Sequence, residues 1–345
     1  MKIPKHILVI RLSAMGDIAM TIPVLKSLSE EYPDMKFTIL TRKFFAPIFE
    51  DLPNVSIFEA DVEGKHKGIP GLKKLAKELK NEGIDAVADL HNVLRSKILK
   101  TCFKFYGIPV KQINKGRSGK KSLTRPNNKV FKQLKMTHQR YADVFDALGL
   151  PVDISSFDFL KKKTLSPEIR KITGKEPKKW LGIAPFAQHT SKVYPLDLMK
   201  EVLRQLEKNE QLQIFLFGGG ATEKEILTEW EDQFSNVISM AGKISFKDEL
   251  ALISNLDAML SMDSGNGHLA ANFGIPVIIM WGLTHPFTGF APYGQPKANN
   301  LIPDLKKYTK IPTSVYGKTV PEGYEDAMRT ITPEMVVKKI EEVVL

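Results

Sequence analysis

Short apolar runs alternate with amphipathic stretches along the first half of the chain. Residues 6–11, His-Ile-Leu-Val-Ile-Arg, are predicted as a short apolar strand, and residues 15–31 then carry apolar side chains at helical spacing. Further strands are predicted at 37–40, 55–58 and 84–88, and further helices near 71–81, 93–106 and 138–148. Short buried strands that alternate with helices are typical of βαβ units around a parallel sheet.

The alternation pauses and then resumes in the second half. Residues 155–179 are rich in Lys, Pro and Ser and lack a sustained period, as an interdomain linker does. Strands are then predicted at 180–184, 213–217, 237–240, 257–262 and 276–281, and helices at 195–208, 224–233, 246–254, 267–273 and 333–344. We therefore predict an α/β chain of two doubly wound domains, residues 1–160 and 180–332, with a linker at 161–179.

This architecture also predicts where a ligand binds. In doubly wound sheets, ligands bind at the carboxyl ends of the strands. With two such domains, we expect the strand-to-helix loops to face a central cleft.

Length and composition agree with two folded domains. A chain of 345 residues has room for about two domains. Its 43% hydrophobic and 26% charged residues exclude wholesale disorder. The single cysteine, Cys102, excludes an internal disulfide framework and a cysteine-built metal site. The first residues form no secretory hydrophobic region, and no apolar run is long enough to span a bilayer, so a cytoplasmic protein is expected.

Positive charge is concentrated in one stretch. The 50 Lys and Arg residues exceed the 39 Asp and Glu residues, giving a net charge of +11. Residues 111–140 contain ten Lys and Arg residues and no acidic one. A solvated loop explains such a run, and so does an anionic partner: nucleic acid, a phosphorylated metabolite or a membrane surface.

The first candidate loop follows the first strand and contains Gly16 and Asp17. Asp17 falls at or near the start of a helix, where a carboxylate commonly acts as the N-cap. At the mouth of a cleft, the same carboxylate could serve as a general base. The residues alone leave both roles open.

Two further loops carry groups suited to phosphate. Thr190, Ser191 and Lys192 precede a predicted helix, although lysine and hydroxyl side chains are also common in surface loops. Residues 263–268, Asp-Ser-Gly-Asn-Gly-His, join an apolar strand to a helix. Glycines in this setting let backbone N–H groups approach a diphosphate, and a plain tight turn is the alternative.

Other chemistries fit these loops less well. The 263–268 loop is neither a Gly-x-Gly-x-x-Gly dinucleotide fingerprint nor a Walker loop. Its Asp, Ser and His do not form a hydrolase site, because the Gly-x-Ser-x-Gly elbow is absent. His189, His268 and His285 lack the spacing of a metal site. No metal is therefore expected.

Together these segments resemble a known family. Five segments carry the resemblance, in the family's order along the chain: Ile10–Asp17 with Thr21–Pro23, Ser191–Pro195, Asp263–Ala271, Trp281–Pro286 and Ala291–Gly294. They are similar to segments of glycosyltransferase family 9, the ADP-heptose:lipopolysaccharide heptosyltransferases. Tyr194 stands where that family usually has Trp, and Ser264 where it usually has Thr.

The resemblance implies a GT-B fold and an inverting transfer of heptose from ADP-heptose to the lipopolysaccharide inner core, with no obligatory metal or other cofactor. Residues 1–160 would bind the acceptor, residues 180–332 would bind the nucleotide sugar, and the last helix, residues 333–345, would pack back on the N-terminal domain. Asp17 would deprotonate the acceptor hydroxyl, and Lys192 would neutralise the leaving diphosphate.

The resemblance also implies a donor site in the C-terminal domain. Its expected residues are Thr190, Ser191, Lys192, Glu223, Asp263, Ser264, Gly265, Asn266 and His268. Glu223 follows the triple glycine at 218–220, where the family has a glutamate near the nucleotide. Of these residues, Ser264, Gly265 and Asn266 would donate hydrogen bonds to the diphosphate.

The resemblance also suggests a role for the basic residues of 111–140 in binding the acceptor. Lys120, Lys121, Arg125 and Arg140 are expected to steer an anionic glycolipid at the inner face of the cytoplasmic membrane, in peripheral contact with it. Two alternatives stay open: a transferase of the same fold with another nucleotide sugar, and a non-catalytic nucleic-acid-binding protein. Against nucleic acid, the stretch lacks the interleaved aromatic residues of an RNA-binding module.

Overall fold

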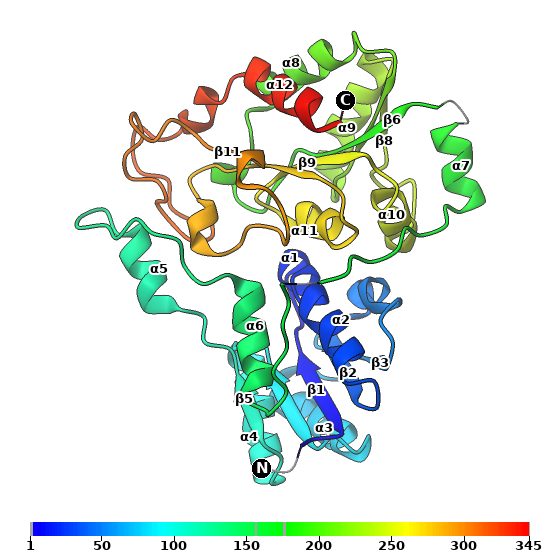
Figure 1. The fold of residues 1–345 in the computed structure, drawn as a ribbon, viewed down its shortest axis with the longest axis vertical. Helices are drawn as coiled ribbons and strands as arrows, with labels where there is room; N and C mark the ends of the chain where they lie inside the picture. Colours follow the sequence, from blue (N-terminus) through cyan, green and yellow to red (C-terminus); the bar gives the residue numbers. More distant parts are fainter. Residues whose placement is uncertain (1–2, 156, 175–176, 345) are drawn as a thin grey trace. The chain divides into compact units, whose positions relative to one another are not determined.

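The computed structural model describes residues 3–155, 157–174 and 177–344, and the chain divides into two compact units (Figure 1). The N-terminal unit comprises Met1–Lys115 and Lys135–Phe159, and the C-terminal unit comprises Gly116–Leu134 and Leu160–Leu345. Two positions of the expected linker, 175 and 176, and the last position of the expected final helix, 345, lie outside the described residues.

A five-stranded parallel sheet forms the centre of the N-terminal unit. Its strands are β1 (His6–Ile10), β2 (Lys36–Thr41), β3 (Val55–Glu59), β4 (Ala86–Asp89) and β5 (Val110–Gln112). They lie in the order β3-β2-β1-β4-β5, and every described pairing is parallel. The chain winds outward in both directions from β1, so the sheet has a topological switch point between β1 and β4.

Helices cover both faces of this sheet. The elements are α1 (Met15–Ala19), α2 (Ile22–Glu31), η1 (Lys43–Phe49), α3 (Gly68–Asn81), α4 (Leu94–Phe105) and α6 (Thr137–Asp146). Leu75 of α3 and Phe103 of α4 are fully buried against strand residues such as Leu8. On the other face, Phe37 of β2 meets Phe145 of α6 edge to face, with ring centroids 6.4 Å apart.

The C-terminal unit is built on a second parallel sheet. Its strands are β6 (Lys179–Ala184), β7 (Leu212–Leu216), β8 (Val237–Ser239), β9 (Ala258–Met262), β10 (Val277–Met280) and β11 (Asn300–Leu301). The order is β11-β10-β9-β6-β7-β8, with parallel pairing throughout the described registers. The switch point lies between β6 and β9, so the loops that follow these two strands are neighbours.

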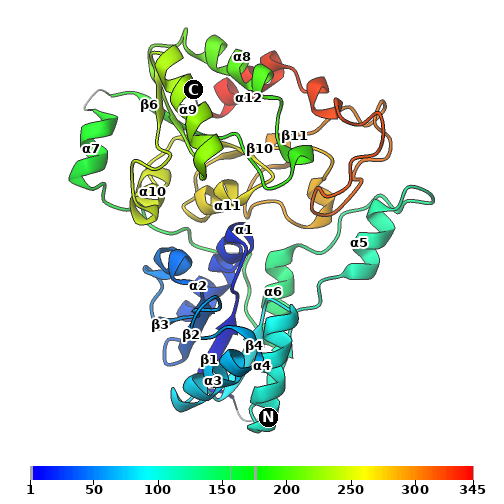
Figure 2. The ribbon, with the colours of Figure 1, turned by 180° about the vertical axis from the view of Figure 1, so that it is seen from behind.

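The larger helices of this unit also form two layers (Figures 1 and 2). They are α8 (Leu196–Leu206), α9 (Ala221–Gln233), α10 (Phe246–Ile253), α11 (Gly265–Asn272) and α12 (Pro333–Val344). Side chains of α8, α9 and α12 share one core with the sheet, as Met199, Trp230 and Val336 illustrate. Pro333 begins α12, where its fixed φ suits the first helical turn.

The last helix differs from its expected position. The resemblance implied that residues 333–345 pack back on the N-terminal domain, but α12 packs against α8 of the C-terminal unit. Val336, Ile340 and Val344 recur at helical spacing and are buried in that core. This apolar stripe is the physical reason for the helix's place in the C-terminal unit.

The expected domain boundaries also change at two places. Residues 116–134, which the sequence assigned to the N-terminal domain, pack in the C-terminal unit and contain α5 (Arg117–Thr124). The expected linker contains α7 (Pro167–Thr173), and Ser166 caps it by accepting a hydrogen bond from the Ile169 N–H. The remaining 3-10 turns are η2 (Thr190–Lys192), η3 (Pro286–Thr288), η4 (Lys297–Asn299) and η5 (Ala327–Thr330). None of the helices in the described parts of the chain is long and apolar enough to cross a bilayer.

Candidate active site

Lys192 and Asp263 meet at the switch point of the C-terminal sheet. Lys192 lies in the loop after β6, and Asp263 directly follows β9. The Lys192 ammonium is 2.9 Å from Asp263 Oδ2, and both side chains are largely buried, with 15% and 9% exposed. Thr284 Oγ1 donates a hydrogen bond of 2.8 Å to the same carboxylate oxygen. This carboxylate therefore holds a lysine cation at the carboxyl edge of the sheet, the edge at which doubly wound sheets generally bind ligands.

Neighbouring backbone fixes the loop that carries this lysine. Ser191 Oγ donates to the Gly317 carbonyl at 2.6 Å, and the Ser191 carbonyl accepts from the Leu283 N–H at 3.0 Å. Gly282 approaches so closely that a Cβ there would lie 1.9 Å from the Ser191 carbonyl oxygen. Thr190, by contrast, is exposed. The structure thus places Thr190, Ser191 and Lys192 in one tightly held turn, η2.

The N-terminus of α11 lies directly after Asp263. Ser264 is the N-cap residue, and its hydroxyl lies 3.2 Å from the Ser261 hydroxyl. Gly265 and Asn266 begin the helix, where N–H groups without helical partners favour an anion. Gly267 serves packing instead, because a Cβ there would lie 2.7 Å from Ile279 Cδ1 on β10.

A half-buried carboxyl group contacts this helix start. Asn266 Nδ2 lies 3.4 Å from Glu249 Oε1 of α10. Burial raises the pKa of Glu249 to about 7, and the hydrogen bond from Asn266 opposes this rise. The carboxyl group therefore keeps its proton to a higher pH than an exposed glutamate does.

Glu223 occupies the first turn of α9. Its Oε2 accepts a 2.7 Å hydrogen bond from the Gly219 N–H. The side chain therefore folds back over the triple glycine at 218–220 and fixes this loop. Gly220, with φ +85°, takes a backbone conformation that side chains disfavour.

The three candidate histidines have separate surroundings. His268 is buried in α11, and His189 is the N-cap of η2. His285 is buried and accepts a hydrogen bond from the Phe287 N–H through Nδ1. Burial, and then the charge of Lys129, lower the pKa of His285 to about 4. In the described part of the chain, no three His, Cys, Asp or Glu side chains form a group that could hold a metal ion.

Tyr194 belongs to the core rather than to a ligand site. Its side chain is fully buried, and its hydroxyl donates to the Ile331 carbonyl at 2.7 Å. Burial raises the pKa of this hydroxyl well above its usual range. The replacement of the family's usual Trp by Tyr194 is therefore a change in the core, and it does not indicate which nucleotide sugar is the donor.

In the N-terminal unit, Arg11 and Asp17 form an ion pair at the carboxyl end of β1. Arg11 Nη2 is 2.5 Å from Asp17 Oδ2, and Arg11 Nη1 donates to the Leu90 carbonyl at 2.6 Å. The Arg11 side chain is 6% exposed and that of Asp17 is 29% exposed. Asp17 lies in the first turn of α1, whose N-cap is Ala14, so the interpretation of Asp17 as an N-cap is wrong.

His91 supports the same edge of the sheet. Burial, and then the nearby charge of Arg11, lower its pKa to about 3, so the ring is neutral at pH 7. Asp89, at the end of β4, accepts hydrogen bonds from the N–H groups of His91 and Asn92, each at 2.9 Å. The turn after β4 is therefore rigid beside the Arg11–Asp17 pair.

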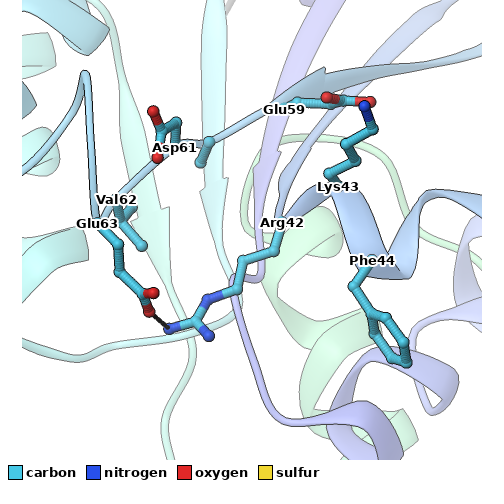
Figure 3. A pocket seen from close by; sticks show the side chains of 8 residues that line it. Arg42, Lys43, Phe44, Glu59, Asp61, Val62 and Glu63 are labelled. Atoms are coloured by element: carbon cyan, nitrogen blue, oxygen red, sulfur yellow. Dashed lines mark ion pairs between the residues drawn. The ribbon is translucent and has the colours of Figure 1, made fainter.

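A cavity of about 330 Å³ opens at the ends of β2 and β3 in the same unit. Its lining residues are Arg42, Lys43, Phe44, Glu59, Ala60, Asp61, Val62 and Glu63. Figure 3 shows Arg42 pointing toward Glu63, and the two side chains are 3.5 Å apart. The lining mixes cations and carboxylates, so it has no net preference for an anion.

The four residues expected to bind the acceptor differ in exposure and in contacts. Lys121 and Arg125 are exposed, as a steering role requires. Lys120 is only 7% exposed, and its ammonium lies over the Phe290 ring, 4.1 Å from the centroid. Arg140 donates hydrogen bonds to the backbone carbonyls of Asn114 and Lys135, so its guanidinium holds these two backbone segments together. The prediction that all four face an acceptor is therefore wrong for Lys120, because its packing against Phe290 buries it.

The family assignment follows from comparison with known proteins. The family model described as glycosyltransferase family 9 (heptosyltransferase) matches residues 72–318, well over half of the chain. The chain belongs to glycosyltransferase family 9. It is therefore a glycosyltransferase, and the resemblance found in its motifs is confirmed.

Individual relatives of this family 9 chain match along most of its length. The lipopolysaccharide core heptosyltransferase OpsX of Haemophilus influenzae is 26% identical over 332 residues, covering 91% of this chain and 88% of that protein. Lipopolysaccharide heptosyltransferase 3 of Escherichia coli is 25% identical over 321 residues, covering 86% and 87%.

Solved structures confirm the fold. The glycosyl transferase family 9 structure from Veillonella parvula has a TM-score of 0.75 at 20% identity and covers 99% of this chain and 97% of that one. The E. coli ADP-heptose lps heptosyltransferase II has a TM-score of 0.67 at 20% identity and covers 98% of each chain. The family 9 chain therefore has the predicted GT-B fold of two Rossmann-like domains.

Several residues of these sites were not predicted from the sequence. Arg11 was predicted only as the end of a strand and as part of the resemblance segment Ile10–Asp17, although a charge at the end of an apolar run is a signal for a site at the sheet edge. Thr284 lies in the resemblance segment Trp281–Pro286, but no role was predicted for it. Gly317 and Glu249 had no such signal, because their proximity to Lys192 or Asn266 depends on tertiary packing.

Proposed function

We propose that this glycosyltransferase moves heptose from ADP-heptose to an acceptor in the lipopolysaccharide inner core, with inversion at the anomeric carbon. The observation that carries the proposal is the Lys192–Asp263 pair at the switch point, beside the N-terminus of α11. A fixed cation next to free helical N–H groups suits a nucleoside diphosphate. The relatives described above, which include lipopolysaccharide heptosyltransferases, support heptose as the sugar.

The proposed reaction uses groups from both units. Asp17 accepts the proton of the acceptor hydroxyl, whose oxygen attacks the anomeric carbon. The bond from that carbon to the diphosphate oxygen breaks, and ADP leaves with the electron pair. Lys192 and the first N–H groups of α11 stabilise the charge that develops on ADP. Arg11 holds the Asp17 carboxylate in place through the ion pair.

The remaining donor-site residues complete the proposal. Thr190, Ser191, Ser264, Gly265 and Asn266 contribute hydrogen-bonding groups around the diphosphate. Glu223 and His268 take part from α9 and α11, which begin at the same edge of the sheet as the loop of Lys192. Asp263 positions Lys192.

The test is a donor screen with purified protein. ADP-, UDP- and GDP-linked sugars, including ADP-heptose, are offered with a truncated inner-core glycolipid, and release of each nucleoside diphosphate is measured. We expect release of ADP from ADP-heptose that depends on the acceptor. Faster turnover of another nucleotide sugar would favour the alternative of a different donor. A thermal shift produced by oligonucleotides but not by ADP would instead favour nucleic-acid binding.

For the acceptor side, we propose that the exposed Lys121 and Arg125 steer the anionic glycolipid. Changing both to Gln should raise the acceptor KM and flatten its dependence on salt, while the donor KM stays nearly constant. An unchanged acceptor KM at low salt would show that these residues belong to a solvated surface.

We also propose peripheral contact with the inner face of the cytoplasmic membrane through α4. Leu94 and Phe105 are 74% and 87% exposed, and at eleven residues apart they lie on one face of the helix. Lys97 and Lys104 share this exposed face, giving the apolar and basic mixture of an interfacial helix. Flotation with anionic vesicles tests this. The parent should float and the Leu94→Ser/Phe105→Ser variant should not, and a parent that stays unbound would contradict the proposal.

A further inference from the structure

Residues 116–134, here called the basic segment, leave the N-terminal unit and pack within the C-terminal unit. The segment consists of α5 and the residues that follow it, 125–134. A hydrogen bond of 3.0 Å from the Val130 N–H to the Ser122 carbonyl connects these residues to α5. Figures 1 and 2 both show α5 beside the orange loops that follow β10. At its end, the Leu134 N–H donates to the Phe287 carbonyl at 3.0 Å. The segment is therefore attached to the unit that carries Lys192.

Lys129 makes the most specific attachment. Its ammonium donates to the carbonyl oxygens of Lys310 and Pro312, at 2.6 and 2.8 Å. Burial lowers the pKa of Lys129 to about 8. A partly buried ammonium between two carbonyl groups fixes backbone rather than attracting a distant ligand.

Lys120 attaches the segment to the other end of the same loop. Its ammonium lies 4.1 Å from the centroid of Phe290 and 5.8 Å from that of Tyr316. The two rings are themselves 5.8 Å apart. Residues 310–317 are here called the 310–317 loop. Lys129 contacts the start of this loop, and Lys120 contacts Tyr316 near its end.

The 310–317 loop contacts the candidate donor site directly. The Gly317 carbonyl accepts the hydrogen bond from Ser191 Oγ, at 2.6 Å. Gly317, at φ +81°, packs so closely that a Cβ there would lie 2.7 Å from Cγ and Cδ of Lys192. Thr313 donates its N–H to the Leu283 carbonyl at 2.9 Å, and Leu283 in turn donates to the Ser191 carbonyl. The position of this loop therefore defines the space around the Lys192 side chain.

We propose that Lys129 and Lys120 are positioning residues of the donor site, which act by holding the 310–317 loop against Ser191 and Lys192. This inference rests on the proposed function, since it takes Lys192 as the diphosphate ligand. It gives these two lysines of the basic segment a role in donor binding, although the basic segment lies in the sequence between the two parts of the N-terminal unit. Removal of either ammonium should loosen the loop and lower the affinity for a nucleoside diphosphate.

The test compares Lys129→Met with Lys132→Met. Both lysines belong to the basic segment, but Lys132 is exposed. Calorimetric titration with ADP should give a Kd raised about tenfold for Lys129→Met, and a parental Kd for Lys132→Met. With substrates, Lys129→Met should raise the donor KM and leave the acceptor KM unchanged, a split that general destabilisation would not produce. A parental ADP Kd for Lys129→Met, or a rise in the acceptor KM alone, would overturn the inference.

Two further variants keep the result interpretable. If Lys129→Met fails to fold by circular dichroism, Lys120→Met provides the same test, because it removes the contact with Phe290 and Tyr316. Lys192→Met, titrated in parallel, separates the two hypotheses. If Lys192→Met binds ADP like the parent, the proposed donor site is wrong. If Lys192→Met loses affinity while both Lys129→Met and Lys120→Met keep it, only the positioning role is wrong.

Discussion

The Lys192 ammonium and the Asp263 carboxylate are 2.9 Å apart, and the two residues follow strands that are adjacent in the sheet but distant in the sequence. At the proposed donor site, the two charges would act differently on a bound diphosphate. The cation would attract it, whereas the carboxylate would repel it and hold the cation in place. Substitution of each residue should therefore change nucleotide binding in opposite directions.

Lys192→Met should weaken ADP binding at least about tenfold, because a hydrogen bond to a charged group contributes roughly 1.5–3 kcal/mol. Asp263→Asn should bind ADP as tightly as the parent or more tightly, since the repulsion is gone. Its kcat should still fall, because Lys192 loses the partner that orients it. Calorimetry and steady-state rates measure both effects. Equal weakening of ADP binding by the two variants would contradict this division of roles.

Gly317 provides a test of close packing against Lys192. Gly317→Ala would put a methyl group 2.7 Å from the lysine side chain, at a residue with φ +81°. Gly323→Ala is the matched control, because Gly323 has φ +77° but no atom near its missing Cβ. Both variants should lose about 1 kcal/mol or more of stability through backbone strain. Only Gly317→Ala should also weaken ADP binding, by roughly tenfold.

Melting temperatures and ADP titrations of the two glycine variants separate strain from steric overlap. If Gly323→Ala reduces ADP affinity as much as Gly317→Ala, the effect comes from general loosening of this region. The contact with Lys192 would then not define the donor site.

The fold was predictable where burial leaves a local pattern. The apolar runs of β1, β6 and β9 gave the strands, and their carboxyl ends gave the loops with Asp17, Lys192 and Asp263. β5 and β11 were not predicted, because Val-Lys-Gln and Asn-Leu each contain a single apolar residue, whereas the equally short β8, Val-Ile-Ser, contains two.

The basic segment shows why other features could not be predicted. Lysines without an apolar period suggest a solvated loop, yet Lys120 is buried over Phe290, which is 170 positions away in the chain. Tyr194 shows the reverse case. It lies inside a family motif, but its hydroxyl contacts Ile331 in the core. In both cases the partner comes from a distant segment, and a single sequence does not reveal such pairs.

Glu249 should make stability depend on pH. Its pKa is about 7 in the folded protein and near the reference value of 4.5 when unfolded. The unfolded state therefore binds fewer protons between these values, and stability falls as pH rises from 4.5 to 7. Glu249→Gln should remove this cost and raise the melting temperature at pH 8. A gain of about 1 kcal/mol corresponds to roughly 2–4 °C for a domain of this size.

Thermal melts across pH check this expectation. The gain of Glu249→Gln over the parent should shrink toward zero as pH falls to 4.5. Glu210→Gln, which changes an exposed carboxylate of the same unit, should show no comparable gain. A melting temperature for Glu249→Gln that equals the parental one at pH 8 would show that Glu249 is not destabilised by burial.

The proposed base, Asp17, is tested by Asp17→Asn. The amide keeps the size of the side chain and an oxygen that can accept from Arg11, but it cannot take a proton at neutral pH. No helix cap is lost, because Ala14 is the N-cap of α1. General-base catalysis typically supplies a factor of 10²–10⁴, so kcat should fall at least about a hundredfold. The ADP Kd should stay parental, since the proposed diphosphate ligands belong to the C-terminal unit.

The control is Asp34→Asn, which changes an exposed carboxylate of the N-terminal unit. If Asp17→Asn retains more than about a tenth of the parental kcat while chemistry limits the rate, Asp17 is not the base.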